Sequence, residues 1–139
     1  MITLEQYFMG RDATYAADLT PNIVRNATDL LERVNRLIER MGNAVTWENH
    51  PVNRSLVSSG WRPPAVNAAT AGAAMHSHHM TGCAVDLYDP HGELDDWLLE
   101  MLPVIGGEFG LYLEHPASTK GWAHLQNVAP RSGRRVFYP

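Results

Sequence analysis

The sequence has little of several features that would assign it to a class of protein. It contains one cysteine, Cys83, so no disulfide can form within the chain. Basic residues are not in excess: 11 Lys and Arg stand against 15 Asp and Glu, for a net charge of −4. Nucleic-acid binding is therefore not expected, because it usually needs a basic face. Membrane insertion is not expected either, since no apolar run approaches the roughly 20 residues that span a bilayer.

A secretory signal pattern is also missing from the first residues. Residues 1–12 include Glu5 and have neither a basic start nor a sufficiently long apolar run. We therefore expect synthesis in the cytoplasm without a signal peptide. If the substrate lies outside the membrane, another component must export or release the protein.

The length and composition of the chain are typical of one globular domain. The 139 residues are 45% hydrophobic and 19% charged, which suffices for a single core and argues against disorder. No repeat, low-complexity tract or linker interrupts the chain. We expect a single α+β domain over residues 1–139, in which a small antiparallel sheet packs with an N-terminal helix and a second helix.

The spacing of apolar residues predicts the N-terminal helix at about residues 21–41. Thr20 is a suitable N-cap, Pro21 fits the first helical position, and Gly42 can end the helix. The apolar residues between them form one stripe, which we assign to the core.

The second amphipathic helix is expected from residue 94 to residue 102. Pro103 would end it, because proline lacks an N–H and is poorly tolerated within a helix. Asp95 and Asp96 are expected on its solvated face.

Short segments bounded by turn residues predict the strands of the sheet. They are residues 54–61, 83–88, 110–114, 122–126 and, at the edge, 135–139. Residues 65–79 are small and polar and predict a loop with one helical turn. The region 54–128 therefore forms the core expected to hold the functional site.

Histidines are concentrated in one part of that core, since four of the seven lie within residues 76–91. His79 precedes a turn that contains Gly82, and Asp86 follows on a predicted strand beside the small Ala84. A loop imidazole and a strand carboxylate can then converge on one point. A catalytic zinc takes three protein ligands and keeps a fourth position for water, and these two residues would supply two of the three.

The third ligand must come from another segment. His124 shares a strand face with Trp122 and Gln126, because side chains alternate along a strand. It is a reasonable ligand, although a buried histidine bonded to the backbone would produce the same pattern. Cys83 is possible by chemistry, but alternation places it on the opposite face from Asp86, so we assign it to the core.

The combined motifs resemble those of a known peptidase family. The resemblance is to the zinc peptidases of the D-alanyl-D-alanine carboxypeptidase type, which include D-Ala-D-Ala dipeptidases, phage L-alanyl-D-glutamate endolysins and the hedgehog domain. It rests on the motif Ser77-x-His79-x-x-Gly82-x-Ala84-x-Asp86, on the later Trp122-x-His124 and on the upstream segment SGWRPPAVN. Each motif alone is weak evidence, but the combination is specific.

The resemblance implies roles for the matching residues. His79, Asp86 and His124 match the zinc ligands, so zinc is the expected cofactor. Arg62 matches an arginine that stabilises the oxyanion of the scissile carbonyl, an effect worth on the order of 3 kcal/mol; a solvated loop arginine is the alternative. Ser77 matches a serine that either binds substrate or orients the loop.

The chain departs from the family pattern at the general base. Family members place Glu or Asp three residues before the last zinc histidine, where this chain has Gly121, or use a His-x-His pair, where it has Trp122. Trp122 flanks the expected site and could line a substrate cleft or pack in the core. The base must therefore come from elsewhere.

Glu114 is the first candidate for this base. It would lie beside His124 if residues 110–114 and 122–126 pair as neighbouring strands. A surface glutamate at a strand end is the alternative. His115 is the next candidate, followed by His76 and His78 in the motif loop.

The expected function is zinc-dependent hydrolysis of an amide bond in peptidoglycan stem peptides. The resemblance implies a D-Ala-D-Ala carboxypeptidase or an L-Ala-D-Glu endopeptidase. It is to a small phage-type member of the family, which suggests a lysis protein or a virion-associated protein that acts on the cell wall after release. The alternative is a degenerate metal-binding domain that binds a wall peptide or a protein partner. The missing acid at Gly121 supports that alternative, whereas Arg62 and Ser77 count against it.

Overall fold

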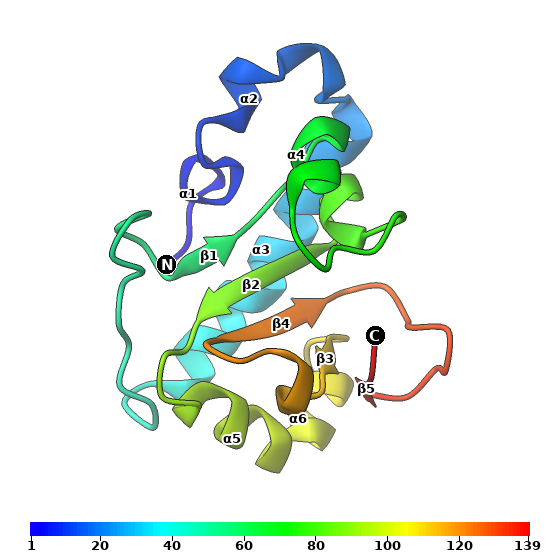
Figure 1. Cartoon of the computed structure of the whole chain (residues 1–139). Helices are drawn as coiled ribbons and strands as arrows, with labels where there is room; N and C mark the ends of the chain where they lie inside the picture. Colours follow the sequence, from blue (N-terminus) through cyan, green and yellow to red (C-terminus); the bar gives the residue numbers. More distant parts are fainter.

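The longest element is helix α3, Pro21–Met41, which lies behind the sheet in Figure 1. The computed structural model describes all 139 residues. Thr20 caps α3 by accepting a hydrogen bond from the Ile23 N–H, and Gly42 follows its end with a φ of 55°. These ends agree with the capping residues that the sequence indicates. None of the helices has the length and apolar character needed to cross a membrane.

The sheet has five strands in the order β1-β2-β4-β3-β5. Their bounds are β1 Val57–Ser59, β2 Ala84–Tyr88, β3 Tyr112–Glu114, β4 Trp122–Gln126 and β5 Val136–Phe137. All neighbours are antiparallel except β5, which pairs parallel to β3 at the edge. The expected α+β fold with a largely antiparallel sheet is confirmed.

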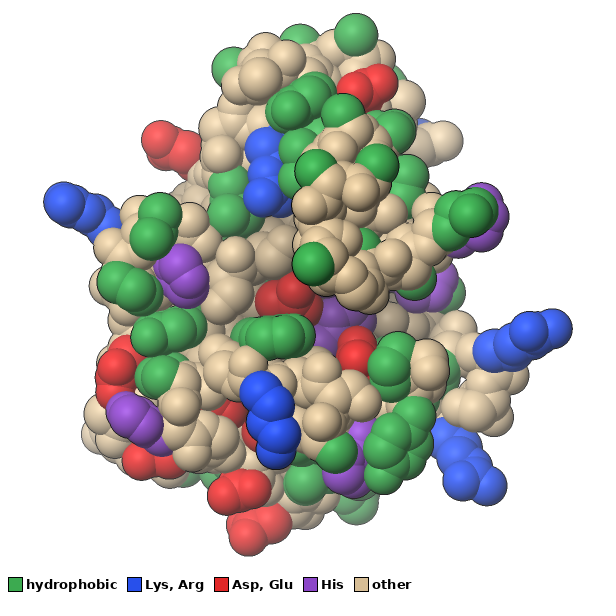
Figure 2. All heavy atoms as spheres, in the orientation of Figure 1, with side chains coloured by type: hydrophobic (Ala, Val, Ile, Leu, Met, Phe, Trp, Pro, Cys, Tyr) green, Lys and Arg blue, Asp and Glu red, His purple; other side chains and the backbone are tan.

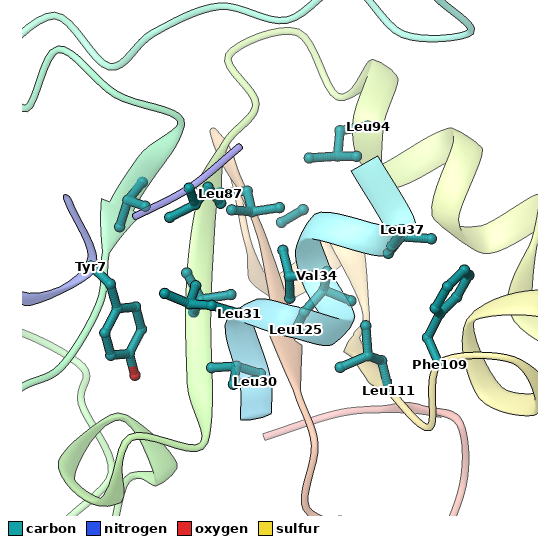
Figure 3. Packing of buried hydrophobic residues seen from close by; sticks show 14 of the residues in the cluster. Tyr7, Leu30, Leu31, Val34, Leu37, Leu87, Leu94, Phe109, Leu111 and Leu125 are labelled. Atoms are coloured by element: carbon teal, nitrogen blue, oxygen red, sulfur yellow. The ribbon is translucent and has the colours of Figure 1, made fainter. Parts of the chain in front are cut away.

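The core lies between α3 and one face of this sheet. Leu31 and Val34 of α3 lie beside Leu87 of β2 and Leu125 of β4, and Leu37 lies on the side of Leu94 and Phe109 (Figure 3). Full burial of such a side chain contributes roughly 1.5–3 kcal/mol. Because side chains alternate along a strand, the residues between these apolar ones point to the opposite face of the sheet, which α3 does not cover.

Two short helices before α3 were not expected from the sequence. They are α1, Leu4–Phe8, and α2, Arg11–Thr14. Helix α1 buries Tyr7 and Phe8, and the Tyr7 hydroxyl donates to the Ala84 carbonyl over 2.9 Å. The N-terminal segment is therefore packed against the first residue of β2.

Helix α4, Pro64–Ala69, exceeds the single helical turn that the sequence indicates for this region. Its first residue is a proline, which fits there because the first N–H of a helix needs no partner within it. A short 3-10 turn, η2 His78–Thr81, then leads into β2.

Two expectations for the C-terminal half are wrong. Helix α5 spans Glu93–Glu100, and Pro103 lies in the first turn of a further helix, α6 Leu102–Gly107, instead of ending α5 at residue 102. Asp95 is not solvated: it is 4% exposed, and its Oδ2 accepts a hydrogen bond from the Thr119 hydroxyl over 3.3 Å.

Candidate metal centre

His79 is positioned by the η2 turn that precedes β2. The Ser77 hydroxyl accepts a hydrogen bond from the His79 N–H and so caps the turn, which means that Ser77 orients the loop. Gly82 ends the turn with a φ of 78°, and a Cβ there would lie 2.7 Å from the Ile23 carbonyl oxygen of α3. Glycine is therefore required for this close approach to the helix.

Asp86 and His124 are direct partners in the register of β2 and β4. Both point to the sheet face that α3 leaves uncovered. Asp86 Oδ1 lies 2.8 Å from His124 Nδ1 and 3.2 Å from His79 Nε2. Each of the three residues offers one ligand atom, and these atoms all lie within 4.8 Å of one another.

The tautomer of His79 follows from the hydrogen bond that its Nδ1 makes. Nδ1 lies 2.8 Å from the Gly60 carbonyl oxygen. A carbonyl can only accept, so Nδ1 carries the proton and donates it. In the neutral ring Nε2 then presents a lone pair to Asp86 Oδ1, and two such acceptors at 3.2 Å need a proton or a metal ion between them.

Burial and charge separate the pKa values of the three groups. Burial lowers the pKa of His79 despite the opposing charge of Asp86, which favours the neutral imidazole that binds metals. For Asp86, burial acts to raise the pKa, but the charge and hydrogen bonds of His79 and His124 outweigh it and hold the pKa well below its usual value. For His124, burial is outweighed by Asp86, and the pKa is raised.

Arg62 reaches this centre from the segment after β1. It is buried, with Nη2 3.7 Å from Asp86 Oδ2 and a backbone N–H that donates to the His79 carbonyl. Its Nε has no hydrogen-bond partner. The guanidinium is thus held beside the three residues while part of its donor capacity is unused.

Glu114 lies at the end of β3, on the other side of His124 from Asp86 in the sheet order. Tyr112 and Leu113 pair with β4, so the expected pairing of these two strands is present. Glu114 Oε2 lies 3.9 Å from His124 Nδ1. Burial raises the pKa of this carboxyl, with His124 opposing and Asp86 adding to the shift.

Acidic and histidine side chains gather on one face of the molecule. Figure 2 shows acidic and histidine side chains meeting in a recess near the middle of this face, with hydrophobic side chains at its edges. Trp122 is 37% exposed at the start of β4, on the same strand face as His124. It is therefore available to a ligand, whereas Trp61 is fully buried and belongs to the core.

The family model for Peptidase M15 matches residues 13–116, which is more than half of the chain. The chain belongs to peptidase family M15. His79 and Asp86 lie inside the matched segment, and His124 lies beyond it, so the association of His124 with them rests on the register of β2 and β4. No curated protein and no solved structure gives a significant match.

The donor set of this M15 peptidase fits the zinc on which its family depends. Zinc in proteins is held by histidine nitrogen and carboxylate oxygen at about 2.0–2.2 Å, so tetrahedral ligand atoms lie about 3.3 Å apart. The two contacts of Asp86 Oδ1, at 2.8 and 3.2 Å, are close to that spacing. The facing lone pairs of neutral His79 and of Asp86 are also suited to a metal ion between them.

The alternative candidates for the base have other surroundings. The His115 ring stacks on Tyr138 with centroids 4.5 Å apart, and its Nδ1 accepts from the Ala117 N–H. His76 is exposed. His78 is half-buried, and burial lowers its pKa. Among the candidates, Glu114 is the residue whose side chain lies within 4 Å of one of the three residues, with Oε2 3.9 Å from His124 Nδ1.

Sequence reasoning missed two groups that contact the histidines. The Gly60 carbonyl accepts a hydrogen bond from His79 Nδ1, and Gln126 Oε1 lies 3.1 Å from His124 Nε2. A backbone carbonyl leaves no signal in a sequence. Gln126 did leave one, since alternation along the strand places it on the same face as His124.

Proposed function

We propose that this M15 peptidase hydrolyses an amide bond in the stem peptides of peptidoglycan, with zinc held by His79, Asp86 and His124. The observation that carries the proposal is the convergence of these three donors with a buried guanidinium, Arg62, and a carboxylate, Glu114. Metal ligands alone would suit a structural site. A neighbouring cation and a neighbouring carboxylate are what amide hydrolysis needs in addition.

Zinc at this position would supply a Lewis acid that polarises the scissile carbonyl and lowers the pKa of water. His79 would bind through Nε2, because its Nδ1–H is engaged by the Gly60 carbonyl. Asp86 brings the negative charge that compensates the metal, and its depressed pKa keeps it ionised at neutral pH.

Glu114 is proposed to move the proton. Its Oε2, on the metal side of His124, would accept a proton from the attacking water and return it to the nitrogen of the leaving amine. Burial raises the pKa of this carboxyl, which brings it closer to the range in which an acid can both take and release a proton. Glu114 would thus replace the acid that Gly121 lacks.

Arg62 is proposed to stabilise the negative charge that develops on the carbonyl oxygen. Its side chain is fixed by burial, and its backbone N–H is bonded to the His79 carbonyl. A cation fixed in advance needs no reorganisation during the reaction, which is why such groups stabilise a transition state effectively. Trp122 is proposed to contact the peptide at the edge of the recess.

The bond is proposed to be either the terminal D-Ala-D-Ala bond or the internal L-Ala-D-Glu bond. The resemblance to small phage members supports a role in lysis or in a virion. The test uses purified peptidoglycan: mass spectrometry would find free D-alanine for the first bond and a new D-glutamyl amino terminus for the second.

The deciding experiment combines zinc content with hydrolysis. Elemental analysis of the wild type is expected to give about one zinc per chain, lost in His79→Ala and retained in the control His91→Ala, since His91 is exposed and pairs only with Glu48. New amino groups should appear from peptidoglycan and stop on chelation. Zinc without release would instead indicate a binding domain, and absence of zinc would overturn the metal site.

A further inference from the structure

Gln126 lies beside His124 on the same face of β4. It is 3% exposed, so both ends of its amide are removed from water and need partners in the protein. Oε1 lies 3.1 Å from Nε2 of His124, and Nε2 of Gln126 donates to the Val128 carbonyl over 2.7 Å. The amide therefore connects the chain just after β4 to the imidazole.

The orientation of this amide is determined by Val128. A carbonyl oxygen can only accept, so the NH₂ group of Gln126 must face it. The oxygen of the amide then faces His124, and it too can only accept. Nε2 of His124 must consequently carry a proton and donate it to Gln126 Oε1.

This hydrogen bond decides which nitrogen of His124 is available to a metal. With the proton on Nε2, the lone pair of the neutral ring is on Nδ1, the nitrogen 2.8 Å from Asp86 Oδ1. His79 shows the same arrangement with its nitrogens exchanged, because there the Gly60 carbonyl holds Nδ1–H and leaves Nε2 facing Asp86. Each histidine thus has an acceptor behind it that directs a lone pair to the same point.

We propose that Gln126 is a positioning residue of the metal centre, which holds His124 in the Nε2–H tautomer and in the ring orientation that binds zinc through Nδ1. The proposal rests on the proposed function in that it takes His124 as a zinc ligand. A hydrogen bond to the outer nitrogen of a ligating histidine typically changes metal affinity by about 10–100-fold.

The test replaces Gln126 by methionine, which keeps the length of the side chain but lacks the amide. Zinc affinity is measured by competition with a chromophoric chelator, and Gln126→Met is expected to bind zinc about 10–100-fold more weakly than the wild type. The matched control is Gln6→Met, the same chemical change at the chain's other glutamine, which lies in α1 and bonds to Thr3. It should leave zinc affinity unchanged.

A conservative variant separates the hydrogen bond from packing. Gln126→Glu retains an oxygen that can accept from His124 Nε2 but loses the N–H that donates to Val128, so it should recover part of the affinity that Gln126→Met loses. The ring proton gives a second readout: in zinc-loaded wild type, the Hε2 proton of His124 should exchange slowly with solvent in NMR spectra. It should exchange rapidly in Gln126→Met.

The outcomes separate this inference from the proposed function. If Gln126→Met keeps wild-type affinity and a slowly exchanging Hε2, the positioning role is overturned while the zinc site stands. If the wild type itself binds no zinc, or if His124→Ala binds it as well as the wild type, the metal site fails. The expected pattern is loss in Gln126→Met, partial recovery in Gln126→Glu and no change in Gln6→Met.

Discussion

Glu114 Oε2 lies 3.9 Å from His124 Nδ1, although ten positions separate the two residues in sequence and no motif joins them. The relationship results from the antiparallel pairing of β3 with β4, in which Leu113 faces Leu125. It brings a half-buried carboxylate to the metal side of His124 in a chain that has Gly121 where relatives have an acid.

The first prediction concerns this carboxylate. Glu114→Gln preserves the shape of the side chain but removes its ability to accept a proton, so hydrolysis should fall by about 10²–10⁴-fold. Zinc content should stay at the wild-type level, because Glu114 is not one of the three donors. The measurements are kcat on a soluble stem peptide and zinc by elemental analysis.

Glu108→Gln is the matched control for Glu114→Gln. Glu108 is exposed and pairs with Arg40 at 3.5 Å, a surface contact of little energetic value. It should retain full activity. Undiminished hydrolysis in Glu114→Gln would remove this residue from the mechanism.

The second prediction concerns Arg62. Arg62→Gln removes the fixed positive charge, and kcat should fall by about 10²–10³-fold because the developing oxyanion loses its partner. Some loss of stability is also expected, since Asp86 loses a charged neighbour 3.7 Å away. Arg25→Gln, an exposed arginine of α3, is the control. A change in KM alone would argue against stabilisation of the transition state.

The third prediction tests the support behind His79. In Gly60→Ala the new Cβ would lie 1.9 Å from the Tyr7 carbonyl oxygen, so the backbone must move. The free energy of unfolding should fall by about 2 kcal/mol, as measured by urea denaturation. Zinc affinity should fall as well, because the same segment carries the carbonyl that holds His79.

Gly107→Ala is the control for Gly60→Ala. Gly107 ends α6, is exposed and has open space around its Cβ position, so alanine there should leave stability unchanged or slightly raised. Equal effects of the two substitutions would show that the close approach of Tyr7 does not constrain Gly60.

The fourth prediction concerns the buried Asp95. Burial, with the charge of Asp89 adding to it, raises the pKa of Asp95 to about 7. The unfolded chain releases this proton near pH 4 and the folded one near pH 7, so the free energy of unfolding should fall as pH rises between these values. Below pH 4 both states hold the proton and no penalty applies.

Asp95→Asn should remove that pH dependence. The variant should be more stable than the wild type above pH 7, by about 1–2 kcal/mol after allowance for relaxation and screening. The difference should shrink toward pH 4. Asp96→Asn is the control, because Asp96 is exposed on the same helix. A constant difference at all pH values would mean that Asp95 does not carry the raised pKa.

The pair His79 and Asp86 and helix α3 were accessible from sequence because the signals that mark them are local, whereas His124 joins the pair only through the register of β2 and β4. Helix α3 carries its own cap, its own apolar stripe and its own terminating glycine within residues 20–42. The motif around His79 and Asp86 spans one turn and one strand, so short-range geometry predicts that the two converge. The wrong expectation at Pro103 was also local, since the same residue can end one helix or begin another.

Tertiary structure decided the relationships between distant segments. The burial of Asp95 depends on Thr119, the approach of Glu114 to His124 depends on strand pairing, and the carbonyl behind His79 depends on where Tyr7 packs. Periodicity and capping act over a few residues, whereas register, desolvation and hydrogen bonds across the sheet involve residues tens of positions apart. The residue types of the candidate metal centre can therefore be predicted from the sequence of this M15 peptidase. Their tautomers, their pKa values and the position of the candidate base arise from packing.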